Sequence, residues 1–147
     1  MQVIRARNPA VFKHPEVEAL MRRAFLDRPA SIDFDKAQAD FEALINDERT
    51  GAFIGVDDDA VICAVGIIML PQNALVSVPQ ALVMYNEGPA AVKNAVLDAV
   101  VDFVKQAGYT TYWALNRTGR DDAVWARAFR RAGDATKIAS VMQFEVP

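Results

Sequence analysis

The sequence has one cysteine and one histidine among its 147 residues, and these two scarcities exclude whole classes of site. A single thiol, Cys63, cannot form an intrachain disulfide, and one thiol with one histidine, His14, cannot build a structural zinc site. Lysine and arginine total 16 against 19 acidic residues, so a net charge of -3 offers no bulk attraction to nucleic acid or anionic lipid. The sequence therefore predicts a cytoplasmic protein without metal, nucleic acid or membrane.

Long hydrophobic runs, low-complexity segments and internal repeats are also missing. No apolar stretch approaches the roughly 20 residues that a membrane-spanning helix needs. Residues 1–7 have charge but lack the apolar segment of a signal peptide. No linker divides the chain, and its length suits one hydrophobic core. We therefore expect one unprocessed domain that covers residues 1–147.

The stretch 81–133 has the most regular pattern in the chain. Residues 81–85 form an apolar strand pattern that stops at the turn-forming residues 86–89. Apolar residues then recur at spacings of three and four, which predicts an amphipathic helix that ends at Gly108. Residues 110–115 are rich in β-branched and aromatic side chains and predict a strand. Because the connection is long, the two strands should lie parallel with a right-handed crossover.

The rest of the chain completes a mixed sheet covered by helices. The further predicted elements are a strand at 2–7, a helix from Pro15 to near Leu26, a helix capped by Asp33, strands at 52–56 and 60–70, a helix at 121–132 that ends at Gly133, and a last strand at 138–146. The three aspartates at 57–59 read as a turn, because the further ligands that calcium needs are missing. The predicted class is α/β (α+β), in the order β-α-α-β-β-β-α-β-α-β, with a mixed, mainly antiparallel central sheet and helices on both faces.

This order, with three short motifs, resembles the GNAT superfamily of acyl-CoA N-acyltransferases over nearly the whole chain. The motifs are Phe129-Arg130-Arg131-Ala132-Gly133, the asparagine at 116 after a strand, and the turn Tyr85-Asn86-Glu87-Gly88-Pro89-Ala90. The turn keeps the glycine and the small residue of the family's phosphate-binding turn but lacks its leading glutamine or arginine. The resemblance implies acetyl-CoA (coenzyme A) as cofactor, bound by Met84, Tyr85, Gly88, Ala90, Ala91 and Asn116.

The resemblance also implies catalytic roles for two residues, Glu87 and Tyr85. Glu87 ends the central strand and is the best-placed base to remove the amine proton, although a solvated turn acid is an equal reading. The family commonly protonates the leaving thiolate with a tyrosine at the position of Phe129, which has no proton to give. Either Tyr85 or Tyr112 substitutes, or the thiolate leaves unassisted, or the reaction has been lost. Arg127, in the last helix, is one of several arginines that either attract cofactor phosphates or simply form a solvated face.

Two functions follow from these features. One is an acyl-CoA-dependent N-acyltransferase that transfers acetyl from acetyl-CoA to an amine of a small-molecule or protein acceptor. The alternative is a catalytically lapsed GNAT-like fold that acts as an interaction or structural module in a larger assembly. Protein partners and a homo-oligomer remain open in both readings.

Overall fold

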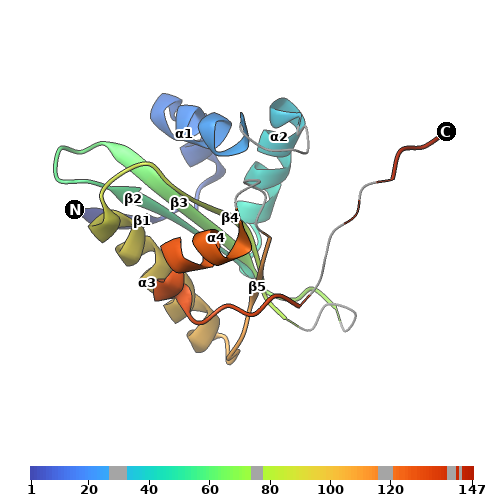
Figure 1. Cartoon of the computed structure of the whole chain (residues 1–147). Coiled ribbons are helices and arrows are strands. Elements are labelled where there is room, and N and C mark those ends of the chain that lie inside the picture. Colours follow the sequence, from blue (N-terminus) through green and yellow to red (C-terminus); the bar gives the residue numbers. More distant parts are fainter. Residues whose placement is uncertain (27–32, 74–77, 116–120, 139–141, 143) are drawn as a thin grey trace.

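In the part of the chain that the structure describes, five strands form one sheet with helices on both faces (Figure 1). The structure is a computed structural model that describes residues 1–26, 33–73, 78–115, 121–138, 142 and 144–147. The strands lie side by side in chain order: β1 Gln2–Arg5, β2 Thr50–Val56, β3 Ile62–Met69, β4 Gln80–Asn86 and β5 Trp113–Ala114. Neighbours from β1 to β4 are antiparallel, and β5 is parallel to β4. The predicted mixed, mainly antiparallel sheet is confirmed.

Helices cover both faces of this sheet. On one face lie the short helix η1 (Pro9–Lys13), α1 (Pro15–Leu26) and α2 (Phe34–Ile45), and on the other lies α3 (Ala90–Gln106) (Figure 1). Helix α4 (Asp122–Ala128) and the short helix η2 (Arg130–Ala132) follow β5, and η2 packs against α3. Within the described ranges, no helix combines the length and the apolar character needed to cross a membrane.

The helix ends follow local rules that the sequence displays. Pro15 occupies the first position of α1, where its missing N–H costs nothing. The Asp33 side chain accepts a hydrogen bond from the Lys36 amide at 3.3 Å and so caps α2. Helix α3 ends shortly before Gly108, whose φ of 88° lies in the left-handed region that favours glycine. These predicted boundaries are confirmed.

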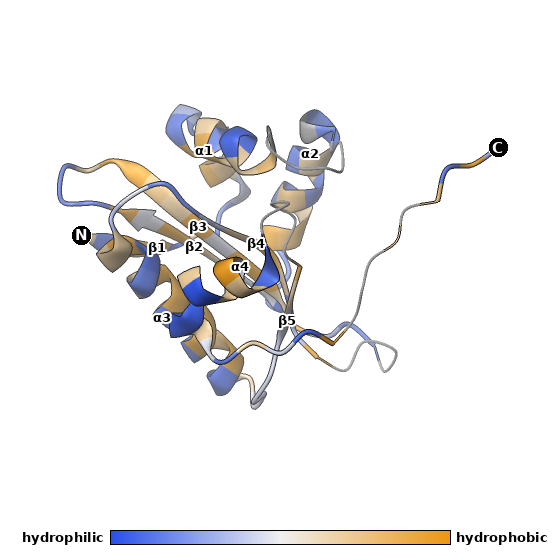
Figure 2. Ribbon diagram, in the orientation of Figure 1, coloured by the Kyte–Doolittle hydropathy of each residue, from blue (hydrophilic) through white to orange (hydrophobic). Residues whose placement is uncertain are grey.

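Two apolar clusters hold the helices to the sheet, and β3 contributes to both. Val65 and Ile67 pack into the cluster beneath α1 and α2, whereas Ala64 and Ile68 pack beneath α3. Figure 2 shows strands β2 and β3 with hydrophobic colour, while α3 carries hydrophilic turns as well as hydrophobic ones. A strand covered on both faces explains the unbroken apolar sequence of β3.

Glycines in β2 and β3 let α3 lie close to the sheet. A Cβ atom at Gly55 would lie 2.6 Å from Val92 Cγ1, and one at Gly66 would lie 2.9 Å from Val100 Cγ2. Gly51 is equally crowded beneath the same helix. Non-bonded carbon atoms prefer about 3.5–4.0 Å, so a larger residue at these positions would push α3 outward.

The predicted turn between β2 and β3 is confirmed. Asp57 Oδ1 accepts hydrogen bonds from the amides of Asp59 and Val61, each at 2.9 Å. Ala60 has a φ of 62°, a left-handed conformation that a tight turn requires. The carboxylate of Asp57 therefore acts as a local acceptor for backbone amides, which is a common use of aspartate in turns.

The predictions for the C-terminal third need correction. Strand β5 covers only Trp113–Ala114 of the predicted 110–115, and the helix predicted at 121–132 divides at Phe129 into α4 and η2. The predicted last strand is absent at its described positions, 138, 142 and 144–146, where Phe144 is 84% exposed. Positions 139–141 and 143 lie outside the described residues. A sixth strand needs a long neighbouring edge for its hydrogen bonds, and β5 offers only a short one.

Removal of core volume should show how much the packing around β3 contributes. Ile68 is fully buried, so Ile68→Ala should lower the free energy of unfolding by about 2–5 kcal/mol through lost burial and a residual cavity. Ile4, on edge strand β1, is 41% exposed, so Ile4→Ala is the matched control and should cost less than about 1 kcal/mol. Urea denaturation of both variants measures the difference. Equal losses would contradict the placement of Ile68 in the core.

Candidate active site

Strand β4 separates from β5 after two residue pairs. Gln80 pairs with Trp113 and Ala81 with Ala114, and beyond these the described residues of β5 offer β4 no partner. On the β3 side, Ala81 pairs with Ile68 and Val83 pairs with Ile67. Leu82, between them, has no partner in β3 and therefore forms a β-bulge. A bulge bends its strand and re-aims the residues that follow it. Because strand amides alternate in direction, the stretch from Leu82 to the end of β4 presents backbone groups on its open side.

The turn after β4 is fixed to β3 by packing and by hydrogen bonds. The Glu87 amide donates to the Cys63 carbonyl at 2.9 Å, and Asn86 Nδ2 donates to the Gly88 carbonyl at 2.9 Å. A Cβ atom at Gly88 would lie 2.3 Å from Cys63 Sγ, which no side chain can occupy. Contact with β3 therefore requires glycine at this position, whether or not the turn binds an anion.

The first turn of α3 presents unused backbone donors. Pro89 accepts hydrogen bonds from the amides of Val92 and Lys93, at 3.1 and 3.2 Å, and begins the helical pattern. Ala90 and Ala91 are exposed, and their amides have no acceptor among the described residues. The start of a helix combines such free N–H groups with the positive end of the helix dipole. Small side chains leave both amides accessible to an anion.

An open, mainly basic hollow of about 690 Å³ lies between the start of α3 and the end of α4. Its lining residues are Ala90, Lys93, Asn94, Arg127, Ala128, Arg130, Arg131 and Asp134. Arg131 is paired with Asp98 through contacts of 2.8 and 3.1 Å, and the Lys93 ammonium donates to the Ala128 carbonyl. Arg127 and Arg130 have no ion-pair partner in the described ranges. Arg127, which the sequence offered as a phosphate ligand, therefore shares this hollow with Ala90 at the start of α3.

Glu87 lies in a polar cluster with Tyr85 and Arg23. Arg23, from α1, donates to both carboxylate oxygens of Glu87, with Nε at 3.1 Å from Oε1 and 2.9 Å from Oε2. The Tyr85 hydroxyl donates to Oε2 at 3.1 Å. These hydrogen bonds, Arg23 first, hold the pKa of Glu87 below its usual value, and Glu87 raises the pKa of Arg23. The structure thus brings together the two predicted catalytic residues and adds an arginine.

Tyr112 and Phe129 lie away from this cluster. Tyr85 packs with the apolar cluster beneath α1 and α2, whereas Tyr112 packs with the one beneath α3, so the two hydroxyls belong to opposite faces of the sheet. The Tyr112 hydroxyl donates to the Ala132 carbonyl at 3.1 Å. Phe129 packs on Trp125 with 5.1 Å between ring centroids. Of the two hydroxyls that the sequence left open as proton donors, only that of Tyr85 lies beside Glu87.

The structure places most of the predicted cofactor residues in one continuous segment. Met84 and Tyr85 lie at the open end of β4, Gly88 lies in the turn, and Ala90 and Ala91 begin α3. Asn116 lies outside the described residues.

Sequence reasoning missed two residues of the site, Arg23 and Lys93. Arg23 precedes Glu87 by 64 residues, so no local pattern joins them. Lys93 follows the turn closely, and a base one turn into a helix that starts after a glycine is a signal that could have been used.

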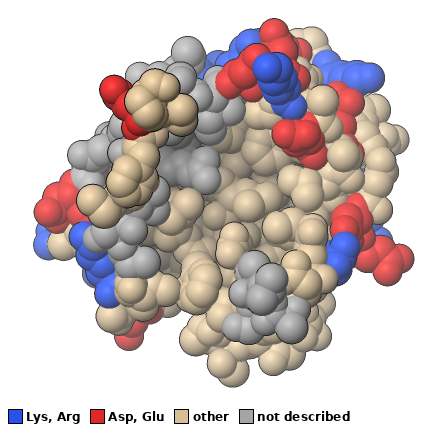
Figure 3. All heavy atoms as spheres, turned by 90° about the vertical axis from the view of Figure 1, so that its right-hand side faces the viewer, with Lys and Arg blue, Asp and Glu red and all other residues tan. Residues whose placement is uncertain are grey.

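Charged side chains do not form a continuous basic surface on the face shown in Figure 3. There the described lysines, arginines and acids lie in mixed groups around a mainly uncharged centre. Nucleic-acid interfaces are instead dominated by clustered positive charge. On this face the described charges of both signs are therefore mixed and do not gather in one basic patch.

Solved structures with the same architecture include an apo aminoglycoside 6'-N-acetyltransferase, AAC(6')-IG from Acinetobacter haemolyticus. It has a TM-score of 0.71 and 12% identity, covering 100% of this chain and 99% of that one. A second is the aminoglycoside acetyltransferase meta-AAC0020 from an uncultured soil metagenomic sample, in complex with sisomicin. It has a TM-score of 0.67 and 12% identity, and the match covers 99% of this chain and 96% of that one. The chain has the GNAT fold.

The GNAT fold extends over the full length of these neighbours. A mutant of the BH1408 protein from Bacillus halodurans likewise matches with a TM-score of 0.69 and 15% identity, over 99% of each chain. No protein-family model matches the sequence, and no curated protein matches it. At such identities the likeness concerns the fold, and it confirms the fold class and the resemblance predicted from element order.

Burial of Tyr112 predicts a distinctive alkaline titration. Burial raises the pKa of Tyr112 from 10.0 to about 12, because the phenolate would lose its hydration. Because the folded state holds this proton more tightly than the unfolded state, the protonated hydroxyl contributes to stability at pH values below the unfolded pKa of 10.0. This contribution is lost as the pH rises from 10.0 to the folded-state pKa of about 12. Tyrosinate absorbance should therefore show a late step that Tyr112→Phe removes. A late step that persists unchanged in Tyr112→Phe would contradict this assignment.

Proposed function

We propose that this chain is an acyl-CoA-dependent N-acyltransferase that transfers an acetyl group from acetyl-CoA to an amine. One observation carries the proposal: the open edge of β4 leads directly into the free amides and the basic hollow at the start of α3. A ligand with an extended amide-containing arm and a phosphate end matches those two parts. The neighbours' names, which specify aminoglycoside acetyltransferases, support the same class of reaction. We propose further that residues 1–147 act as one domain in the cytoplasm.

The residues around α3 suit the phosphates of coenzyme A. The amides of Ala90 and Ala91 would donate to a diphosphate at the positive end of the helix, and Arg127 and Arg130 would add charge. Glu87 follows β4 closely and would repel an anion if it were unpaired. Its carboxylate instead turns to Arg23, which compensates the negative charge. Pro89 contributes no amide, so the site has one donor fewer than a turn without proline.

The polar cluster suits the acceptor half of the reaction. Acetyl-CoA, when bound, supplies a thioester whose C–S bond breaks as the C–N bond to the amine forms. Glu87 is placed to hold the ammonium of the acceptor and to take its proton. Backbone amides on the open side of β4, around Met84 and Tyr85, are available to stabilise negative charge on a carbonyl oxygen. The Tyr85 hydroxyl, beside Glu87, is the proton donor nearest to the base.

Binding of acetyl-CoA should depend on the basic hollow. Arg127→Glu reverses a charge in its lining, so calorimetric titration should show an affinity at least about fivefold weaker than wild type, or about 1 kcal/mol. Arg7→Glu is the matched control, because Arg7 is exposed and follows β1, at the opposite edge of the sheet from β5. It should bind as wild type does. Substitution of Gly88 would be a poor probe, since any side chain there collides with Cys63.

Wild-type protein that shows neither heat nor thermal stabilisation with millimolar acetyl-CoA would exclude the acyltransferase. The fold would then be an interaction module, the second function that the sequence allows. If Arg127→Glu and Arg7→Glu weaken acetyl-CoA binding equally, overall charge explains the effect, and the hollow is not part of the cofactor site.

Loss of the carboxylate at position 87 should affect the chemical step. Glu87→Gln keeps the size of the side chain, but it replaces one acceptor oxygen with an NH2 donor and cannot accept a proton. The rate of acetyl transfer should fall by about 100-fold or more, the usual range for a general base, while acetyl-CoA binds unchanged. Stopped-flow thiol release with a panel of primary amines measures the rate. An active Glu87→Gln variant with wild-type kcat would exclude Glu87 as the base.

A further inference from the structure

Arg23 occupies both carboxylate oxygens of Glu87, the group that would bind the ammonium of an incoming amine. Oε1 of Glu87 accepts from Arg23 Nε and Nη2, and Oε2 accepts from Arg23 Nε and the Tyr85 hydroxyl. A guanidinium and an ammonium seek the same acceptor, and both bring a positive charge. A cation can therefore reach this carboxylate fully only by displacing the arginine.

Of the two partners, Glu87 is the fixed one. Its amide is bonded to the Cys63 carbonyl at 2.9 Å, and the next residue, Gly88, packs directly on Cys63. The Arg23 side chain is long and 46% exposed, and the Glu87 side chain is 30% exposed. Solvent therefore reaches the pair, and rotation of one flexible side chain opens it without moving the backbone of β4 or α3.

We propose that Arg23 is a specificity-determining residue that occupies, in the acceptor-free protein, the position taken by the cationic amine of the acceptor. This inference rests on the proposed acyltransferase function. The acceptor's ammonium replaces the guanidinium on Glu87, and Arg23 turns to solvent. Uncharged acceptors gain nothing from Glu87 and leave the internal pair closed, so the site selects primary amines that are protonated near neutral pH.

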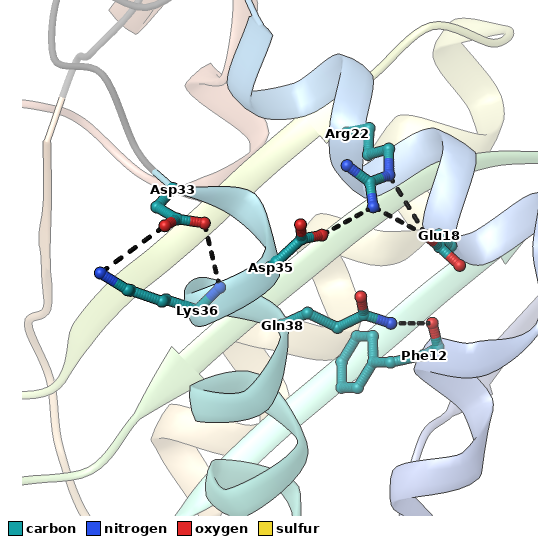
Figure 4. Close-up of polar contacts among 7 residues, drawn as sticks. All are labelled: Phe12, Glu18, Arg22, Asp33, Asp35, Lys36 and Gln38. Atoms are coloured by element: carbon teal, nitrogen blue, oxygen red, sulfur yellow. Dashed lines mark hydrogen bonds and ion pairs between the residues drawn. The ribbon is translucent and has the colours of Figure 1, made fainter.

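Among the described residues, Arg23 is the charged side chain that contacts Glu87. Tyr85 of β4 donates to the carboxylate, and burial first, then Asp57 and Glu87, raise the pKa of the Cys63 thiol in the neighbouring strand β3. The neighbouring Arg22 points elsewhere: it donates to Glu18 on its own helix and to Asp35 of α2, each at 3.0 Å (Figure 4). Two adjacent arginines of α1 thus have different partners, which supplies a matched control.

The test is the binding of putrescine, a simple cationic amine, followed by NMR. Arg23→Ala removes the internal competitor and should bind putrescine about two- to fivefold more tightly than wild type, the range expected of an exposed ion pair. Arg22→Ala removes an equal charge from a side chain of similar exposure, 44%, and should stay near wild type. Glu87→Gln should lose most of the affinity, and butanediol, the uncharged analogue, should not bind. In wild type, putrescine should shift the Arg23 Nε–H signal.

Weaker putrescine binding by Arg23→Ala than by wild type would overturn the inference, because it would make Arg23 a support for Glu87 rather than its competitor. Equal gains in Arg23→Ala and Arg22→Ala would also overturn it, since general charge would then explain both. If Arg23→Ala does not fold, Arg23→Lys is tested instead, because lysine keeps the charge but cannot contact the carboxylate through two nitrogens. Putrescine binding tighter than in wild type then supports displacement of Arg23, and weaker binding refutes it. Acetyl transfer is measured separately. Absence of transfer by wild type would reject the proposed function, whereas the putrescine series decides the role of Arg23.

Discussion

Close contact between α3 and the sheet is the constraint on which the candidate site depends. Gly51, Gly55 and Gly66 remove side chains where the helix passes over β2 and β3, and valines and Phe103 of α3 fill that space. At the helix start, Gly88 repeats the arrangement against Cys63. These contacts fix the first amides of α3 relative to the open end of β4. The cofactor region and the Glu87 cluster therefore share one rigid support, although they serve different parts of the proposed reaction.

Local patterns predicted most of the fold, and non-local pairing accounts for the misses. Helices α1 and α3 follow from apolar periodicity and from Pro15 and Gly108, all within a few residues of the element they describe. Strand β5 is shorter than its β-branched and aromatic sequence suggests, because a strand's extent depends on what its neighbour offers. The bulge at Leu82 has no sequence signal, since it is a relation between β4 and β3.

The same distinction applies to the site. Glu87, Tyr85 and the small residues of the turn could be selected because they surround one predicted boundary between strand and helix. Arg23 could not, because its role exists only after α1 packs across the sheet and meets residue 87. Its effect is electrostatic: the pKa of Glu87 is lowered, which keeps the carboxylate charged but makes it a weak base while the pair is closed. The guanidinium does not give up a proton, whereas an acceptor ammonium on the same carboxylate can, so exchange would put an acidic proton beside Glu87.

The short attachment of β5 has a consequence for how the domain opens. Among the described residues, only two pairs join β5 to β4, and α4 has no buried residue. Strands β2 and β3, in contrast, are paired along their whole length and covered on both faces. Stability should therefore be graded, with amide hydrogens of β2 and β3 exchanging only on global unfolding and those of β5 and α4 exchanging through local opening. Arg127 belongs to the part that opens first. An anion held there would stabilise the least stable third of the described chain, so ligand binding and local order would reinforce each other.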